Sequence, residues 1–126
     1  MKIRIIDVFS EQDTLHVEFS STFGNGTAFW HGAKPSIGEN LDVEFELDEV
    51  FFWKKNIDLS SDTTPKIIAN DGTYTITGEL INDTDNHAIL KLGDSIILVE
   101  LNQSISHNVG FADVRTTAIH FYPTNI

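Results

Sequence analysis

Cysteine is absent from the 126-residue chain. Its absence excludes a disulfide framework, a thiolate-ligated zinc site and a cysteine nucleophile. A chain without disulfides suits a reducing compartment, and we expect a cytoplasmic protein. A chain of this length can bury a hydrophobic core without covalent or metal staples, so we expect a single domain over residues 1–126.

Long apolar runs are also missing. The N-terminal segment Met1–Asp7 carries two basic residues, but it reaches an aspartate after too few apolar positions for a signal peptide. The most apolar run, residues 95–99, has the length of a strand and is far shorter than the ~18 residues that cross a bilayer. We therefore expect neither secretion by this route nor a membrane partner.

Basic residues are scarce. Lysine and arginine total 8, whereas aspartate and glutamate total 19, and the formal net charge is −11. Proteins that bind nucleic acids normally present a basic face that displaces counterions from the phosphates. The charge balance therefore disfavours nucleic acids and anionic membranes as partners, and it favours a basic protein.

Helical periodicity is weak, because no segment keeps a 3.6-residue apolar pattern over three turns; residues 56–62 are the best candidate for a short helix. The clearest period is two. In Leu41–Asp48 four apolar residues alternate with four acids, which is typical of a strand with one buried face. Turn sequences such as Gly93-Asp94 divide residues 73–101 into a predicted three-stranded meander. Shorter alternation or apolar composition predicts strands at residues 2–9, 15–19, 74–80, 87–92, 94–101 and 111–122.

These strands predict an all-β fold, a small antiparallel OB-like β-barrel of about seven or eight strands. A long bent strand at residues 41–53 could serve both sides of a small closed sheet, with a bulge near Asp48 and Glu49 where the apolar parity changes. A two-sheet β-sandwich is the alternative. Residues 22–40 and 56–65 lack periodicity and are expected to be long loops. Alternation predicts a core that includes Leu15, Val17, Phe19, Leu41, Val43, Phe45, Leu47, Ile76, Leu80, Leu98 and Val114.

The acids of the alternating segment are the first candidate site. Two-residue spacing places four of them in line on one strand face, roughly 6.5–7 Å apart. Two further acids flank them, and no lysine or arginine interrupts residues 39–49. We predict that this surface docks a basic protein or mimics the spacing of phosphates; the alternative is a solvated strand face that limits aggregation. The predicted docking residues are Glu39, Asp42, Glu44, Glu46, Asp48 and Glu49.

Aromatic side chains are the second candidate. Trp30 and His31 lie in the predicted loop 22–40, where binding residues are common. Residues 51–53 are three consecutive aromatics, so alternation should direct at least one ring away from the others. An exposed ring there would be an anchor for a partner. Trp30, His31 and Trp53 complete the predicted partner-binding set.

Catalytic and metal-binding patterns are not found in the sequence. No two histidines lie at the spacing of a local ligand pair, so we predict no metal site and no cofactor. No serine lies in a G-x-S-x-G elbow, and the strand acids lack the unequal carboxyl environments that acid–base hydrolysis requires. An enzyme would need a site that tertiary structure assembles from His31 and a carboxylate. The histidines are His16, His31, His87, His107 and His120.

Three hypotheses of function follow from these features. The first is a non-enzymatic protein-binding module, such as an inhibitor, immunity or adaptor protein, whose acidic strand docks a basic partner. The second is an OB-type binder of an oligonucleotide or oligosaccharide that uses exposed aromatics and the long loops. The third is an enzyme with a histidine–carboxylate site.

Overall fold

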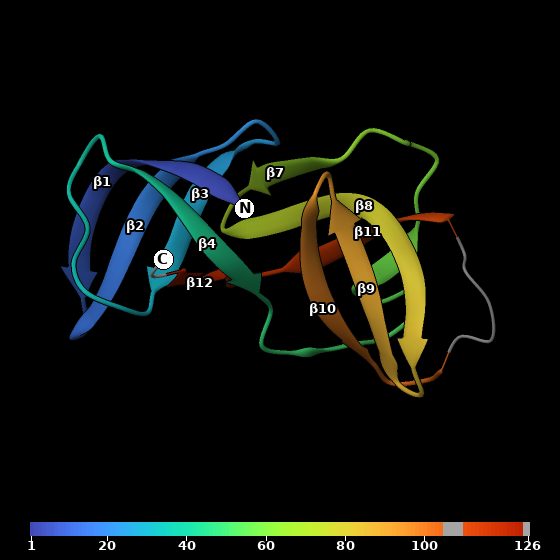
Figure 1. Cartoon of the computed structure of the whole chain (residues 1–126). Helices are drawn as coiled ribbons and strands as arrows, with labels where there is room; N and C mark the ends of the chain where they lie inside the picture. Colours follow the sequence, from blue (N-terminus) through green and yellow to red (C-terminus); the bar gives the residue numbers. More distant parts are fainter. Residues whose placement is uncertain (105–109, 125–126) are drawn as a thin grey trace.

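The computed structural model describes residues 1–104 and 110–124, and these residues form β-strands and their connections (Figure 1). The strands make two units, a closed barrel and a second sheet, that lie side by side. No helix in the described residues is long and apolar enough to cross a membrane. The strands are β1 (Lys2–Glu11), β2 (Thr14–Ser20), β3 (Asn25–Trp30), β4 (Asn40–Glu46), β5 (Val50–Phe51), β6 (Ile57–Leu59), β7 (Lys66–Asn70), β8 (Thr73–Thr84), β9 (His87–Leu92), β10 (Ser95–Leu101), β11 (Gly110–Thr116) and β12 (His120–Pro123).

The barrel is closed by five strands in the order β1-β2-β3-β12-β4, and β4 pairs back onto β1. Neighbouring strands are antiparallel, apart from β3 and β12, which run parallel. Period-two alternation supplies the side chains that fill the barrel. Val17 and Phe19 of β2 and Val43 and Phe45 of β4 are buried in its interior. The predicted all-β barrel is therefore confirmed, and its strand number is that of an OB barrel.

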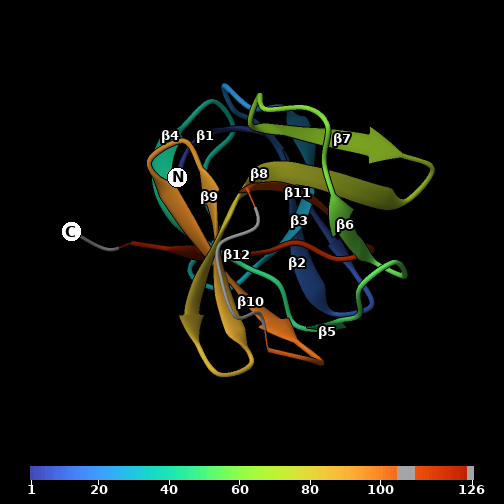
Figure 2. The same cartoon turned by 90° about the vertical axis from the view of Figure 1, so that its right-hand side faces the viewer.

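The second sheet contains the seven strands that lie between β4 and β12 in the sequence. Its order is β5-β10-β9-β8-β11-β6, and β7 pairs with the first part of β8 (Figure 2). Strands β8, β9 and β10 form the predicted meander. The chain thus builds four strands of the barrel, then the whole second sheet, and returns to the barrel with β12.

The barrel and the sheet meet where β7 and β8 approach β3. The N–H of Ile67 donates to the carbonyl oxygen of Phe23 over 2.8 Å, and the hydroxyl of Tyr74 accepts from the N–H of Thr27 over 2.8 Å. Gly24, at a φ of 150°, permits the close approach, since a Cβ there would lie 2.1 Å from the carbonyl oxygen of Ile67. The buried apolar residues of both units form one core cluster.

Several segments differ from the sequence predictions. Residues 22–40 contain β3, and residues 56–65 contain β6 in place of the candidate helix. Near Asp48 and Glu49 there is no bulge within a strand; the chain leaves β4 of the barrel and enters β5 of the second sheet. This transfer changes the apolar parity, because each side of it packs in a different unit. The described residues contain twelve strands, more than the expected seven or eight, since a barrel and a second sheet replace one barrel.

The predicted core is largely confirmed, and Leu98 is the exception. Leu98 is 59% exposed, whereas Ile97 and Val99 are buried. Residues 96–99 are all apolar, so the sequence does not show which of them point inward. The pairing of β10 with β9 decides this. The predicted residues Val17, Phe19, Val43, Phe45, Ile76, Leu80 and Val114 are buried, and Leu15, Leu41 and Leu47 pack against the core from half-buried positions.

Candidate functional site

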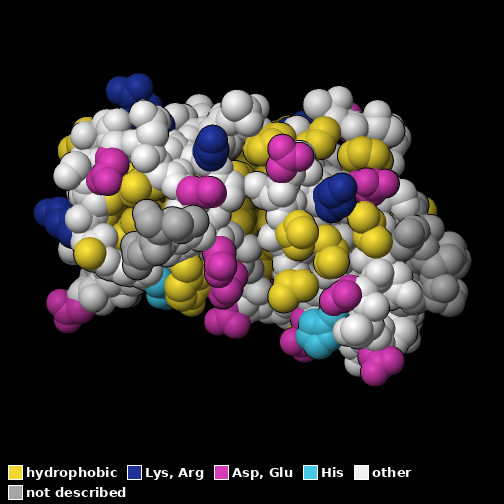
Figure 3. Space-filling model, in the orientation of Figure 1, with side chains coloured by type: hydrophobic (Ala, Val, Ile, Leu, Met, Phe, Trp, Pro, Cys, Tyr) yellow, Lys and Arg dark blue, Asp and Glu magenta, His cyan; other side chains and the backbone are white. Residues whose placement is uncertain are grey.

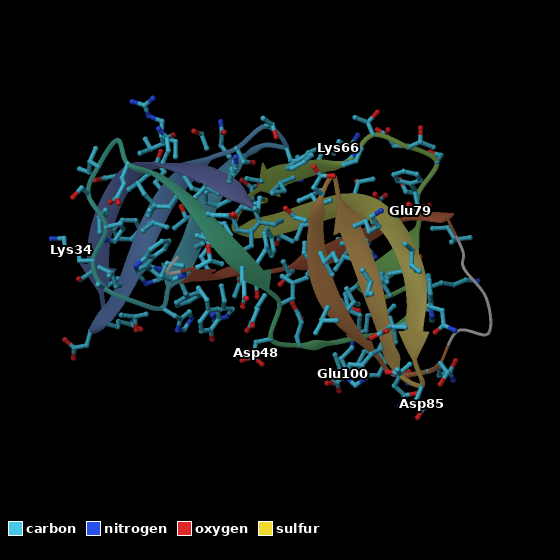
Figure 4. The ribbon with its side chains drawn as sticks, in the orientation of Figure 1. Lys34, Asp48, Lys66, Glu79, Asp85 and Glu100 are labelled. Atoms are coloured by element: carbon cyan, nitrogen blue, oxygen red, sulfur yellow. The ribbon has the colours of Figure 1, made fainter. Side chains whose placement is uncertain are left out.

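An open groove of about 760 Å³ lies between β4 of the barrel and β10 of the second sheet. Figure 3 shows acidic side chains on the barrel and a group of hydrophobic side chains on the sheet beside them. In Figure 4, Asp48 lies beyond the end of β4 and Glu100 near the end of β10. The acidic wall consists of Glu44, Glu46, Asp48 and Glu49, the apolar wall of Val50, Ile96 and Leu98, and His87 and Glu100 complete the lining.

Strand alternation orients the acidic wall. Val43 and Phe45 are buried inside the barrel, so the intervening Glu44 and Glu46 point outward, and both are exposed. Asp48 is also exposed and follows the strand where the chain crosses toward the sheet. The structure therefore places these three acids on one surface, as the sequence pattern predicts.

The apolar wall comes from the outward positions of β10 and from the start of β5. Ile96 and Leu98 are each 59% exposed, and Val50 is 37% exposed. Burial of apolar surface stabilises a complex by about 25 cal/mol per Å². These side chains therefore offer a partner hydrophobic contact directly opposite the carboxylates.

The remaining predicted acids have partners within the chain. Asp42 accepts a hydrogen bond of 3.0 Å from the N-terminal ammonium group, and this bond lowers the pKa of Asp42. Glu39 accepts from the backbone N–H of Ser36 over 3.0 Å, and neither Glu39 nor Asp42 lines the groove. Glu49 accepts from the hydroxyl of Thr116. None of the groove acids forms an ion pair with a lysine or arginine among the described residues, and Glu44, Glu46 and Asp48 lie together on the barrel side of the groove.

A row of six aromatic and imidazole rings crosses the outer wall of the barrel, next to β4. Successive ring centroids are 4.4–5.2 Å apart along the row. Three neighbouring pairs of the row are stacked, with interplanar angles of 5–14°: Phe9 with His16, Phe29 with His120, and His31 with Tyr122. This ring row consists, in order, of Phe9, His16, Phe29, His120, His31 and Tyr122.

Of the rings in this row, only His31 belongs to the binding residues predicted from the sequence. Strand register creates it: Phe9 pairs with His16, His16 with Phe29, and Phe29 with His120. These residues belong to four strands, of which β12 lies far from the other three in the sequence. The signal in the sequence is an aromatic or histidine residue at one position of each strand, and it becomes visible only once the register is known.

Two of the histidines form a direct contact. Nε2 of His31 lies 2.8 Å from Nδ1 of His120, so one imidazole donates a hydrogen bond to the other. Burial lowers the pKa of His120, and the charge of His31 lowers it further, whereas the carboxylates of Asp48 and Glu46 oppose this shift. Tertiary structure therefore brings histidines near carboxylates. No group of three or more His, Cys, Asp or Glu side chains within residues 1–104 and 110–124 could hold a metal ion.

The other predicted contact residues lie outside the groove. Trp30 is 5% exposed and its indole N–H donates to the carbonyl oxygen of Ala33 over 2.8 Å, so its ring packs in the core and is not available to a partner. Trp53 is half-buried against the core, while the adjacent Phe52 is 41% exposed. His107 lies outside the described residues.

Comparisons with known proteins give no match: no protein-family model matches the chain, and neither a curated protein nor a solved structure matches it. Function therefore has to follow from the geometry of the groove and of the ring row. The groove combines acids that form no ion pair in the described part of the chain with exposed apolar side chains. This is the surface that a basic and partly apolar ligand requires.

Proposed function

We propose that this protein is a binding module whose groove holds a basic segment of another protein, and that it acts by binding rather than by catalysis. The observation that carries the proposal is the pairing of Glu44, Glu46 and Asp48 with an exposed apolar wall in one groove. An inhibitor, an immunity protein or an adaptor would act in this way.

Charge supports a basic partner. The five carboxylates that line the groove, on a chain of net charge −11, attract lysine and arginine and accelerate their association. A nucleic acid would bring phosphates against the same carboxylates. The apolar wall supports a protein segment, because the hydrocarbon stems of lysine and arginine pack on apolar surface while their charged ends reach carboxylates.

A saccharide on the ring row is a second candidate. The row crosses β2 and β3, and this face binds ligands in OB barrels. A ligand would compete with stacking inside the row, because Phe9 stacks on His16 and Tyr122 stacks on His31. The groove combines carboxylates and exposed apolar side chains in one hollow, and we therefore favour it.

The proposal can be tested with a synthetic peptide of about nine residues in which arginine alternates with valine. The substitutions Glu44→Gln and Glu46→Gln keep the shape of the wall and remove two charges. We expect the double variant to bind this peptide about tenfold more weakly than the wild type in low salt. The difference should fade toward ~1 M salt, where the screening length is about 3 Å. Titration calorimetry or fluorescence anisotropy measures both affinities.

A charge-matched control separates the groove from the net charge of the molecule. Glu11→Gln with Asp13→Asn removes two charges from exposed positions at the β1–β2 turn, outside the groove. This control should bind the peptide nearly as the wild type does. Equal affinities of the wild type and the Glu44→Gln/Glu46→Gln variant in low salt would contradict the proposal.

A further inference from the structure

One edge of β10 is unpaired and borders the groove. β10 pairs with β9 from Ser95 to Glu100, but on its other side β5 pairs only with Glu100 and Leu101. Residues 95–99 therefore have no second partner strand in the part of the chain that the structure describes. A strand edge of this kind presents free N–H and C=O groups to which another strand can pair.

The hydrogen-bond pattern identifies the residues that face this edge. The N–H of Leu101 donates to the carbonyl oxygen of Asn86 over 2.7 Å, on the β9 side of the strand. Backbone polar groups point to alternate sides along an antiparallel strand. The other odd-numbered residues of β10 therefore also point toward β9, whereas the N–H and C=O groups of Ile96 and Leu98 point to the unpaired edge. Both residues line the groove.

We propose that the basic segment binds in an extended conformation, as a strand added to β10 and hydrogen-bonded to the main chain of Ile96 and Leu98. This inference rests on the proposed function of the groove. Every second side chain of such a strand would lie beside Ile96 and Leu98 on the outer face, with Glu44 and Glu46 across the groove. Arginine and lysine suit these positions, because the stem packs on the apolar side chains and the charged end reaches the carboxylates. The ligand is thus a segment with a basic residue at every second position.

A second copy of this chain is a poor occupant of the same edge. Each copy carries a net charge of −11, and the edge lies across the groove from Glu44, Glu46 and Asp48. Pairing of two copies would therefore bring like charges together. Charged residues near an open edge are one means by which proteins prevent self-association. The groove acids would repel further copies of the chain and attract a basic segment.

Amide hydrogen exchange tests the strand pairing on the wild-type protein with the arginine–valine peptide. In the free protein the amides of Ile96 and Leu98 should exchange quickly, and those of Ile97 and Val99 slowly, because the latter pair with β9. Saturating peptide should slow the exchange of Ile96 and Leu98 by about tenfold or more. A saturated complex in which these two amides exchange as before would overturn the strand pairing and leave the groove proposal in place.

Backbone-methylated peptides provide a second test on the wild-type protein. Methylation of every second amide removes the donors along one edge of the peptide, and the two alternate sets give two peptides of equal composition. One should bind about tenfold more weakly than the other, because only one set faces β10. Equal affinities would contradict strand pairing. No saturable binding of the unmethylated peptide in low salt would overturn both proposals.

A matched pair of variants tests the protein side of the pairing. Leu98→Pro removes an N–H that points to the open edge, where proline is tolerated, and Leu98→Ala removes the side chain but keeps the N–H. Leu98→Pro should lose affinity about fivefold relative to Leu98→Ala. Equal affinities of two folded variants would argue against pairing. If circular dichroism shows that Leu98→Pro does not fold, the methylated peptides decide.

Discussion

Phe45 illustrates how one alternating residue holds the barrel together. Its side chain is 3% exposed, and its ring centroid lies 5.4 Å from that of Phe121, which joins β4 to β12. Truncation to alanine should lower the free energy of unfolding by on the order of 3–5 kcal/mol, because the change leaves a cavity. Urea unfolding measures this loss. Leu98→Ala, at an exposed side chain, is the control and should cost less than about 1 kcal/mol; a similarly small loss for Phe45→Ala would contradict the register.

His120 links the stability of the fold to pH. Burial and the neighbouring His31 hold the pKa of His120 below its usual value of 6.5, against the opposing effect of Asp48 and Glu46. The folded state thus binds this proton less readily than the unfolded state does. The contribution of neutral His120 to the free energy of unfolding is complete above pH 6.5, and it is lost as the pH falls through the lowered pKa of His120.

The substitution His120→Gln should therefore reduce the loss of stability on acidification. Between about pH 7 and about pH 5, the midpoint of thermal unfolding should fall less in the variant than in the wild type. The fall in the thermal midpoint is measured within each protein, because protonation of carboxylates lowers the stability of both. Parallel pH profiles would show that the proton on His120 does not contribute.

At the scale of the element, the outward face of a strand could be predicted from the sequence only where apolar and polar residues alternate. β4 alternates apolar and acidic residues, so the outward position of Glu44 and Glu46 could be predicted. β10 is apolar on both faces, so the exposure of Ile96 and Leu98 could not. The sequence therefore predicted the acidic wall of the groove and missed the apolar wall. β3 was missed because glycine, threonine and alanine give little contrast between faces.

Gly24 allows β7 to lie close to the barrel, and its substitution tests whether the fold needs this contact. Gly24→Ala places a methyl group 2.1 Å from the carbonyl oxygen of Ile67. The substitution also forces alanine to adopt a positive φ of 150°. Gly72→Ala is a suitable control, since Gly72 has a φ of 80° and nothing within 4 Å of the added carbon. The control should cost about 1–2 kcal/mol.

The clash at Gly24 should make its variant clearly less stable than the Gly72 control, because the neighbouring backbone has to move. Denaturant unfolding of both variants gives the comparison. If the two lose equal stability, the close approach of β7 to the barrel is not required for the fold.

For the whole molecule, composition and alternation were sufficient to predict an all-β barrel, but they could not predict its division into two units. The division depends on where the chain changes partners after β4, over residues 47–49, and no turn sequence marks this transfer. It also depends on the pairing of β12 with β3 and β4, which lie far from it in the sequence. The ring row depends on the same long-range register. Local patterns contain no information about such pairings.

The return of the chain to the barrel through β12 has a consequence for biosynthesis. On a ribosome, the strands of the second sheet emerge together and can pair soon after they appear, whereas β3 and β4 must wait for the segment that lies between them. Until then, the edge of β4 at residues 43–46 lacks the partner that fixes its position. The two walls of the groove therefore come into register only after β12 has been translated. A nascent chain that lacks β12 would have no assembled groove, and partner recognition would begin only after this strand has emerged.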